Sequence, residues 1–340
     1  MRRSGRVLTA AILATTSLAG LVLWRYRAEL GFRRRAAERG ALIANTGSGP
    51  IEYAKRGTGF PVLSIHGAGG GHDQGLANAA GLVGDGFQVI SPSRFGYLGT
   101  PVPPDPSPAA QADAHAALLS ELHIARAIVI GVSAGARSAV ELALRHPKRV
   151  VALILIVPGT YAPTGSVSVE RSRASGLVFW LVNAGADFAW WVAENIAPSM
   201  LIRFVGVRPE LLAASAKSER DRVMSLVRSI EPLSLRFAGI NLDSNPKLRG
   251  LPLEQIAIPT LIISARDDLF NTLPAAEFAA SKIPGSKLIV YDTGGHLLVG
   301  HEKEVRTTVR AFLASSVPEL SEQVDRATKA SFPSQPDAIT

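Results

Sequence analysis

Short apolar runs alternate with amphipathic stretches in two parts of the chain. The runs end near Gly, Pro or polar residues and occupy 61–65, 87–90, 127–130, 150–157, 260–264 and 287–291. Unbroken apolar runs of this length are typical of strands that are buried on both faces. Their alternation with helix-type segments predicts an α/β fold, with a mostly parallel sheet flanked by helices.

This alternation stops between residues 158 and 255, where longer apolar and amphipathic stretches take over. Stretches of this kind predict helices, and their place between two strand-rich parts predicts a helical cap inserted into one sheet. The Gly-Ser-Gly-Pro run at 47–50 is interpreted as a linker. The expected organisation is an N-terminal segment 1–40, core halves 41–157 and 256–315, the cap 158–255 and a polar tail 316–340.

The N-terminal segment contains an uncharged run at residues 7–24, with arginines on both sides and Trp24 at its edge. At 1.5 Å per residue, such a run is just long enough to cross a hydrocarbon core of about 30 Å. We therefore expect a single-pass membrane anchor. A signal peptide cleaved near residues 17–19, which would give a secreted protein, is the alternative.

Net charge and cysteine content exclude several classes of protein. The chain has a formal charge of +8, but the nine arginines and two glutamates before residue 40 account for +7 of it. The remaining chain is nearly neutral, which argues against a nucleic-acid partner, because such binding depends on clustered Lys and Arg. The absence of cysteine excludes disulfides, thiolate metal sites and a cysteine nucleophile.

The run Gly131-Val132-Ser133-Ala134-Gly135 has the form G-x-S-x-G and lies between a strand-type and a helix-type segment. A sharp strand-to-helix turn requires small residues on both sides of the serine. It also places the serine at a helix N-terminus, whose partial positive charge favours a developing oxyanion. Ser133 is therefore the predicted nucleophile.

The loop His66-Gly67-Ala68-Gly69-Gly70-Gly71 ends an earlier strand and resembles the H-G-x-x-G motif of the α/β-hydrolase family. The resemblance implies the α/β-hydrolase fold, and an oxyanion hole made by the backbone N–H groups of Ala68 and Ala134. Residues 93–101 resemble a further family loop, for which we expect a structural role.

In this family the acid and the histidine follow the serine along the chain, each just after a strand. By that resemblance the acid is Asp268, because Ala265-Arg266-Asp267-Asp268 fits the family's G-x-x-D pattern with Ala in place of Gly. The adjacent Asp267 is the rival. The histidine is His296, which follows a glycine pair, and His301 is the nearby rival.

A Ser-His-Asp triad predicts hydrolysis of a small-molecule or lipid-like carboxylic ester through an acyl-enzyme. A peptidase and a C–C bond hydrolase use the same triad, and a non-catalytic binding protein on this fold is an alternative of another class. No metal or organic cofactor is implied, because no histidine-carboxylate cluster has ligand spacing. The sequence indicates no oligomeric state.

The predicted cap carries the residues from which a substrate pocket could be built. Trp180, Trp190 and Trp191 are candidates for an apolar acyl pocket, although aromatic residues at helical spacing are also typical of the core of a cap. A peptidase would need a cap carboxylate to hold the amino group of its substrate. Glu170, Asp187 and Glu194 are the candidates for that contact.

Overall fold

The computed structural model describes residues 2–164, 186–244, 247–318 and 320. Its centre is one sheet of eight strands in the order β1-β2-β4-β3-β5-β6-β7-β8. The pairs β1/β2 and β2/β4 are antiparallel, and all the others are parallel. The strands are β1 Leu42–Thr46, β2 Gly49–Arg56, β3 Phe60–Ile65, β4 Phe87–Pro92, β5 Ala127–Val132, β6 Val150–Ile156, β7 Thr260–Ala265 and β8 Lys287–Tyr291.

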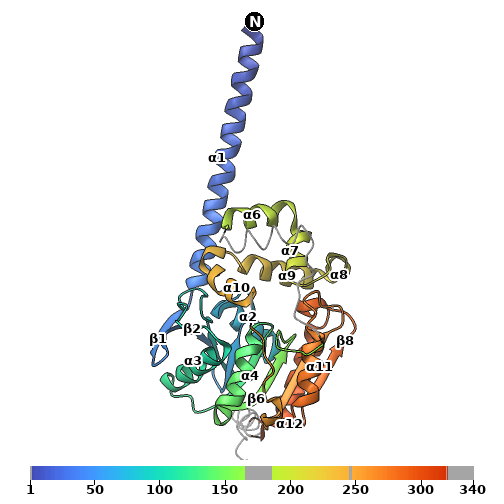
Figure 1. Cartoon of the computed structure of the whole chain (residues 1–340). Coiled ribbons are helices and arrows are strands. Elements are labelled where there is room, and N and C mark those ends of the chain that lie inside the picture. Colours follow the sequence, from blue (N-terminus) through green and yellow to red (C-terminus); the bar gives the residue numbers. More distant parts are fainter. Residues whose placement is uncertain (1, 165–185, 245–246, 319, 321–340) are drawn as a thin grey trace, which may run out of the picture.

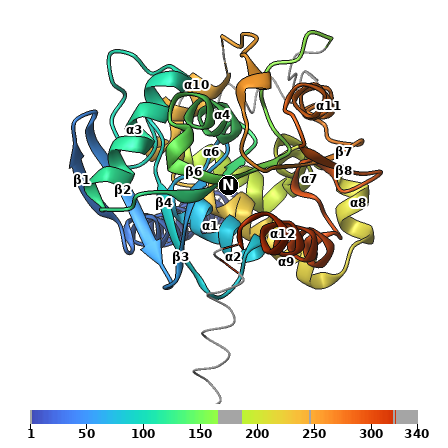
Figure 2. The same ribbon diagram turned by 90° about the horizontal axis from the view of Figure 1, so that it is seen from below.

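Helices cover both faces of this sheet (Figure 2). On one face the alanine- and leucine-rich sides of three helices pack against the strands: α3 (Pro108–Glu121), α4 (Gly135–Arg145) and α11 (Leu273–Lys282). On the other face lie α2 (His72–Leu82) and α12 (Glu302–Ser316). The α/β architecture predicted from the apolar runs is confirmed, and all six predicted strands are present as β3 to β8.

Between β6 and β7 the chain leaves the sheet and forms a layer of helices above the C-terminal ends of the strands (Figure 1). This cap has an apolar core of its own, which includes Trp190, Leu201, Val227 and Ile240. Its described helices are α6 Asp187–Ile196, α7 Pro198–Phe204, α8 Pro209–Ala214, α9 Lys217–Ser229 and α10 Phe237–Ser244, with the one-turn helix η2 Leu233–Leu235 before α10.

The first two strands are a finding that the apolar pattern does not predict. Residues 47–50 do not form a linker, because Gly47 and Ser48 are the turn of a hairpin in which Thr46 pairs with Gly49. Gly49 has a φ of +101°, a conformation that favours glycine and fits the tight turn. This hairpin forms the antiparallel edge of the sheet, where alternating polar residues hide the strand pattern.

The expectation of a membrane anchor at residues 7–24, and with it a membrane localisation, is wrong. In the part of the chain that the structure describes, no helix has both the length and the apolar character needed to cross a membrane. The uncharged run has 18 residues, and four of them are Thr or Ser. A transmembrane helix needs about 20 predominantly apolar residues. The run is instead part of one long helix, α1 (Arg2–Glu38), that extends away from the body (Figure 1).

The C-terminal part of α1 is joined to the cap by buried charges. Arg33 is bonded to Glu194, at 2.8 Å, and to Glu231, which follows α9. The guanidinium group of Arg33 thus forms ion pairs with two carboxylates. Burial raises the pKa of Glu231 to about 7, the charges of Glu194 and Asp187 add to the rise, and Arg33 opposes it. The contact between α1 and the cap is therefore sensitive to protonation near neutral pH.

We expect Glu231 to make the folding free energy pH-dependent. Its pKa is raised on folding from 4.5 to about 7, so its contribution is fully present below pH 4.5 and is lost as the pH rises through about 7. Glu231→Gln should abolish this part of the slope. The measurement is urea unfolding between pH 5 and 8, with Glu210→Gln, on an exposed carboxylate, as the control. Identical pH slopes for wild type and Glu231→Gln would contradict the assignment.

Candidate active site

Ser133 stands at the turn between β5 and α4, in a backbone conformation that few residues adopt. Its φ is +51°, in the left-handed region, where a non-glycine residue is strained. The glycines on either side leave room for the turn. A Cβ on Gly131 would lie 2.6 Å from the Cβ of Ala139, and one on Gly135 would overlap the backbone oxygen of His66. The turn therefore depends on the small residues of G-x-S-x-G.

The glycine-rich loop after β3 lies beside this turn. A Cβ on Gly67 would lie only 3.2 Å from the Cβ of Ser133, so the two backbones are in close contact. Ala68 is exposed, whereas Ala134 is buried at the N-terminal end of α4. The Ala68 and Ala134 segments thus follow the C-terminal ends of the neighbouring parallel strands β3 and β5, and both adjoin Ser133.

Asp268 and His296 come together from the loops after β7 and β8. The Nδ1 atom of His296 is 2.8 Å from Oδ2 of Asp268. Asp268 also accepts hydrogen bonds from the backbone N–H of Phe270, at 2.8 Å, and from the hydroxyl of Thr272. Burial alone would raise the pKa of Asp268, but the charge of His296 and these hydrogen bonds lower it. Asp268 is therefore a buried, ionised partner for His296.

The two rival residues have other partners. Asp267 accepts from the backbone N–H of Gly295 at 2.7 Å and pairs with Arg208 at 3.0 Å. It supports the turn before His296 but does not contact the imidazole ring. His301 bonds to Glu304 at 2.9 Å and stacks on Tyr291. This geometry favours Asp268 and His296 over both rivals.

A cap residue that the sequence does not single out also holds His296. Gly206 lies between α7 and α8, and its backbone oxygen accepts a hydrogen bond from the backbone N–H of His296 at 3.0 Å. A Cβ on Gly206 would overlap the Cβ of His296 and the ring of Phe270, and the φ of Gly206 is +79°. Only glycine fits here, because the cap backbone lies directly on the histidine. A single glycine in a helical region gives no signal of this contact.

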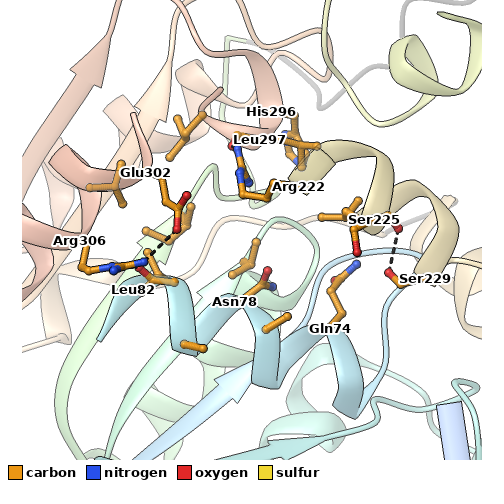
Figure 3. A pocket seen from close by; sticks show the side chains of 18 of the residues that line it. Gln74, Asn78, Leu82, Arg222, Ser225, Ser229, His296, Leu297, Glu302 and Arg306 are labelled. Atoms are coloured by element: carbon orange, nitrogen blue, oxygen red, sulfur yellow. Dashed lines mark hydrogen bonds and ion pairs between the residues drawn. The ribbon is translucent and has the colours of Figure 1, made fainter. Parts of the chain in front are cut away.

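His296 borders a cavity of about 530 Å³ between the cap and the core (Figure 3). Helices α2, α9 and α12 supply most of its lining, and Val132, the neighbour of Ser133, contributes as well. Among the described residues that line it, the charged side chains are paired: Asp73 with Arg236, Arg222 with Glu219 and Arg306 with Glu302. A cavity of this size matches the usual range for small-molecule sites.

Trp190 and Trp191 of the cap lie elsewhere. Trp190 is 2% exposed and packs against Phe204 in the core of the cap. Trp191 donates its indole N–H to Glu29 of α1 at 2.6 Å. Neither is among the described residues that line the cavity, and Trp180 lies outside the described residues.

The described residues contain no group of three or more His, Asp or Glu that could hold a metal ion.

The comparison with protein families is decisive for the fold. The family model described as "alpha/beta hydrolase fold" matches residues 61–302, well over half of the chain. The protein therefore belongs to the α/β-hydrolase family.

Individual relatives agree with this assignment. The chain is 28% identical to a 2-hydroxymuconate semialdehyde hydrolase of Pseudomonas putida, over 77% of this chain and 89% of that protein. It is 29% identical to a pimeloyl-[acyl-carrier protein] methyl ester esterase of Aromatoleum aromaticum, over 62% and 81%. The solved structure of an alpha/beta hydrolase fold protein from Nakamurella multipartita superposes with a TM-score of 0.64 at 29% identity, over 80% and 98%.

We expect Gly135→Ala to destabilise the protein, because the new methyl group would overlap the backbone oxygens of His66 and Ile65. Overpacking of this kind typically costs about 1–3 kcal/mol. Gly81→Ala, in α2 with nothing within 4 Å, is the matched control and should not destabilise. Urea unfolding of both variants gives the comparison, and a Gly135→Ala variant as stable as Gly81→Ala would contradict the close packing.

Proposed function

We propose that the protein hydrolyses neutral carboxylic esters, with Ser133 as nucleophile, His296 as general base and Asp268 as the residue that orients the histidine. The observation that carries this proposal is the bond between buried, ionised Asp268 and Nδ1 of His296. An acceptor on Nδ1 keeps the proton on that nitrogen, so Nε2 is left as the base. Ser133, in its strained turn at the start of α4, is the nucleophile that such a base serves.

In the proposed reaction the Ser133 hydroxyl attacks the ester carbonyl while His296 takes its proton. The N–H groups of Ala68 and Ala134 stabilise the negative oxygen of the tetrahedral intermediate. His296 then gives the proton to the leaving alcohol, and the C–O bond breaks to leave an acyl group on Ser133. Water attacks the acyl-enzyme with His296 again as base, which releases the acid and restores the serine.

The cavity beside His296 supports a neutral substrate. The charged side chains among the described residues that line it are paired, so they offer a charged substrate no unpaired counter-charge. Leu82, Leu226, Leu297 and Leu298 supply apolar surface for the acyl or alcohol part. Ester hydrolysis is also the activity named for the Aromatoleum aromaticum relative.

A C–C bond hydrolase is the second candidate, and the similarity to the Pseudomonas putida semialdehyde hydrolase favours it. A peptidase has less support, because two of the three cap carboxylates that could hold an amino group are already engaged. Asp187 accepts from the backbone N–H and the hydroxyl of Ser234, and Glu194 is paired with Arg33 and Arg228. Glu170 lies outside the described residues.

We expect Asp268→Asn to lower kcat for p-nitrophenyl esters by about 10³- to 10⁴-fold, because an amide favours the wrong tautomer of the histidine. Asp267→Asn is the matched control. Its amide oxygen can still accept from Gly295, so its kcat should stay within about tenfold of wild type. Steady-state kinetics on both variants and on Ser133→Ala decide the matter. An active Ser133→Ala variant, or equal losses in the two Asp variants, would contradict the proposed roles.

A further inference from the structure

The loop 67–71 has the composition Gly-Ala-Gly-Gly-Gly, which by itself specifies no conformation. An oxyanion donor on such a loop is useful only if neighbouring groups hold it in place, because preorganisation is what makes the donor effective. Two hydrogen bonds from core residues constrain this loop. Gln74 accepts the N–H of Gly67 at 3.2 Å, and His66 accepts the N–H of Arg94 through Nε2 at 2.9 Å.

A third constraint on the loop comes from Tyr97, in the loop after β4, which connects it to the cap. The backbone N–H of Gly69, the residue after Ala68, donates to the hydroxyl of Tyr97 at 3.3 Å. That hydroxyl lies 2.6 Å from Oδ2 of Asp243, on α10. The Tyr97 ring is fully buried, meets the ring of His66 edge to face at 4.7 Å, and lies so close to Gly239 that a Cβ there would overlap it.

The charges around Asp243 set the direction of this chain of hydrogen bonds. Burial alone would raise the pKa of Asp243, but Arg94 and Arg137 outweigh it and lower the pKa. Burial and the charge of Asp243 raise the pKa of Tyr97 well above its usual value. Tyr97 therefore stays protonated and donates a hydrogen bond to Asp243, which leaves an oxygen lone pair to accept the N–H of Gly69.

Asp243 also reaches the other half of the candidate oxyanion hole. Arg137 of α4 pairs with Asp243 at 3.3 Å and donates its Nε to the backbone oxygen of Gly159 at 2.8 Å. The N–H of Gly159 in turn donates to the backbone oxygen of Ser133 at 2.9 Å. One cap carboxylate is thus connected both to the Ala68 loop and to the turn that carries Ala134.

We propose that Tyr97 and Asp243 are positioning residues for the oxyanion hole, by which the cap aligns the Ala68 loop with Ser133. The inference rests on the proposed ester hydrolysis. Neither side chain needs to touch the substrate, since the Tyr97 hydroxyl acts on the loop and Asp243 fixes the hydroxyl. The contribution is made when the carbonyl oxygen becomes negative, so it affects the transition state more than the bound ester.

The test is Tyr97→Phe, which removes the hydroxyl and keeps the buried ring. We expect kcat for a p-nitrophenyl ester to fall about 10- to 100-fold with KM unchanged, since misplacing a group by about 1 Å costs up to about 10²-fold. The Ki of a trifluoromethyl ketone, whose serine adduct mimics the tetrahedral intermediate, should rise by a similar factor. Tyr53→Phe, at another buried tyrosine, is the control and should leave both constants at wild-type values.

Amide hydrogen exchange of the peptide that contains residues 67–71 gives a readout independent of catalysis. Tyr97→Phe should speed exchange there. Asp243→Asn retains an oxygen for the Tyr97 hydroxyl but removes the charge that pairs with Arg94 and Arg137, so it should also speed exchange there and should lower kcat at least as much. Unchanged exchange of residues 67–71 in Asp243→Asn would show that Asp243 does not act through Tyr97.

The outcomes separate this inference from the proposed function. Wild-type kcat, Ki and exchange in Tyr97→Phe would overturn the positioning role while leaving ester hydrolysis intact. If the wild-type protein hydrolyses no ester, the proposed function fails. Unchanged loop exchange in Tyr97→Phe would, independently of that result, contradict a positioning role for the hydrogen bond between Tyr97 and Gly69.

Discussion

Backbone segments pack closely around Ser133 at positions occupied by glycine, and the candidate site depends on this close packing. Cβ atoms on Gly67 and Gly159 would lie 3.2 Å from atoms of Ser133, and Cβ atoms on Gly131 and Gly135 would meet α4 and the end of β3. The packing holds the serine in its left-handed conformation, and it sets the loop after β3 against the start of α4. Strain at this residue persists because the surrounding backbone leaves no other arrangement.

The cap is part of the site as well as its cover. Gly206 binds the backbone of His296, and Asp243 connects α10 to both sides of the Ser133 turn. On its outer side the cap is bonded to α1 through Arg33. Buried ion pairs of this kind contribute little net stability, but breaking one leaves a buried charge without a partner. They therefore favour one position of the cap relative to the core.

The apolar runs and the G-x-S-x-G turn were enough to predict the sheet from β3 to β8, since both depend on local sequence. The choice between Asp267 and Asp268 rests on a family pattern and stays a prediction. In the structure the carboxylate of Asp268 bonds to the His296 ring, whereas that of Asp267 accepts from the backbone of Gly295. The apolar pattern does not predict the hairpin of β1 and β2, because polar and apolar residues alternate in these strands. The membrane anchor was predicted from a run that is long and uncharged but is interrupted by Thr, Ser and Gly.

The contacts of Gly206, Tyr97 and Asp243 could not be predicted, because each joins segments far apart in the chain. Asp243 is 146 residues from Tyr97, and nothing near either residue indicates the other. Residues 93–101 were expected to be structural, and the hydrogen bonds of Tyr97 explain how a structural loop can act on the site. Pairings across this distance are set by the packing of the cap on the core, which no local pattern records.

Covalent labelling with a fluorophosphonate, followed by peptide mass mapping, tests the proposed triad most directly. The reagent phosphonylates a serine only when a base activates its hydroxyl. The proposed triad predicts a single adduct, on the peptide that contains Ser133, and no adduct on Ser133→Ala. An unlabelled wild-type protein, or an adduct on another residue that persists in Ser133→Ala, would contradict it.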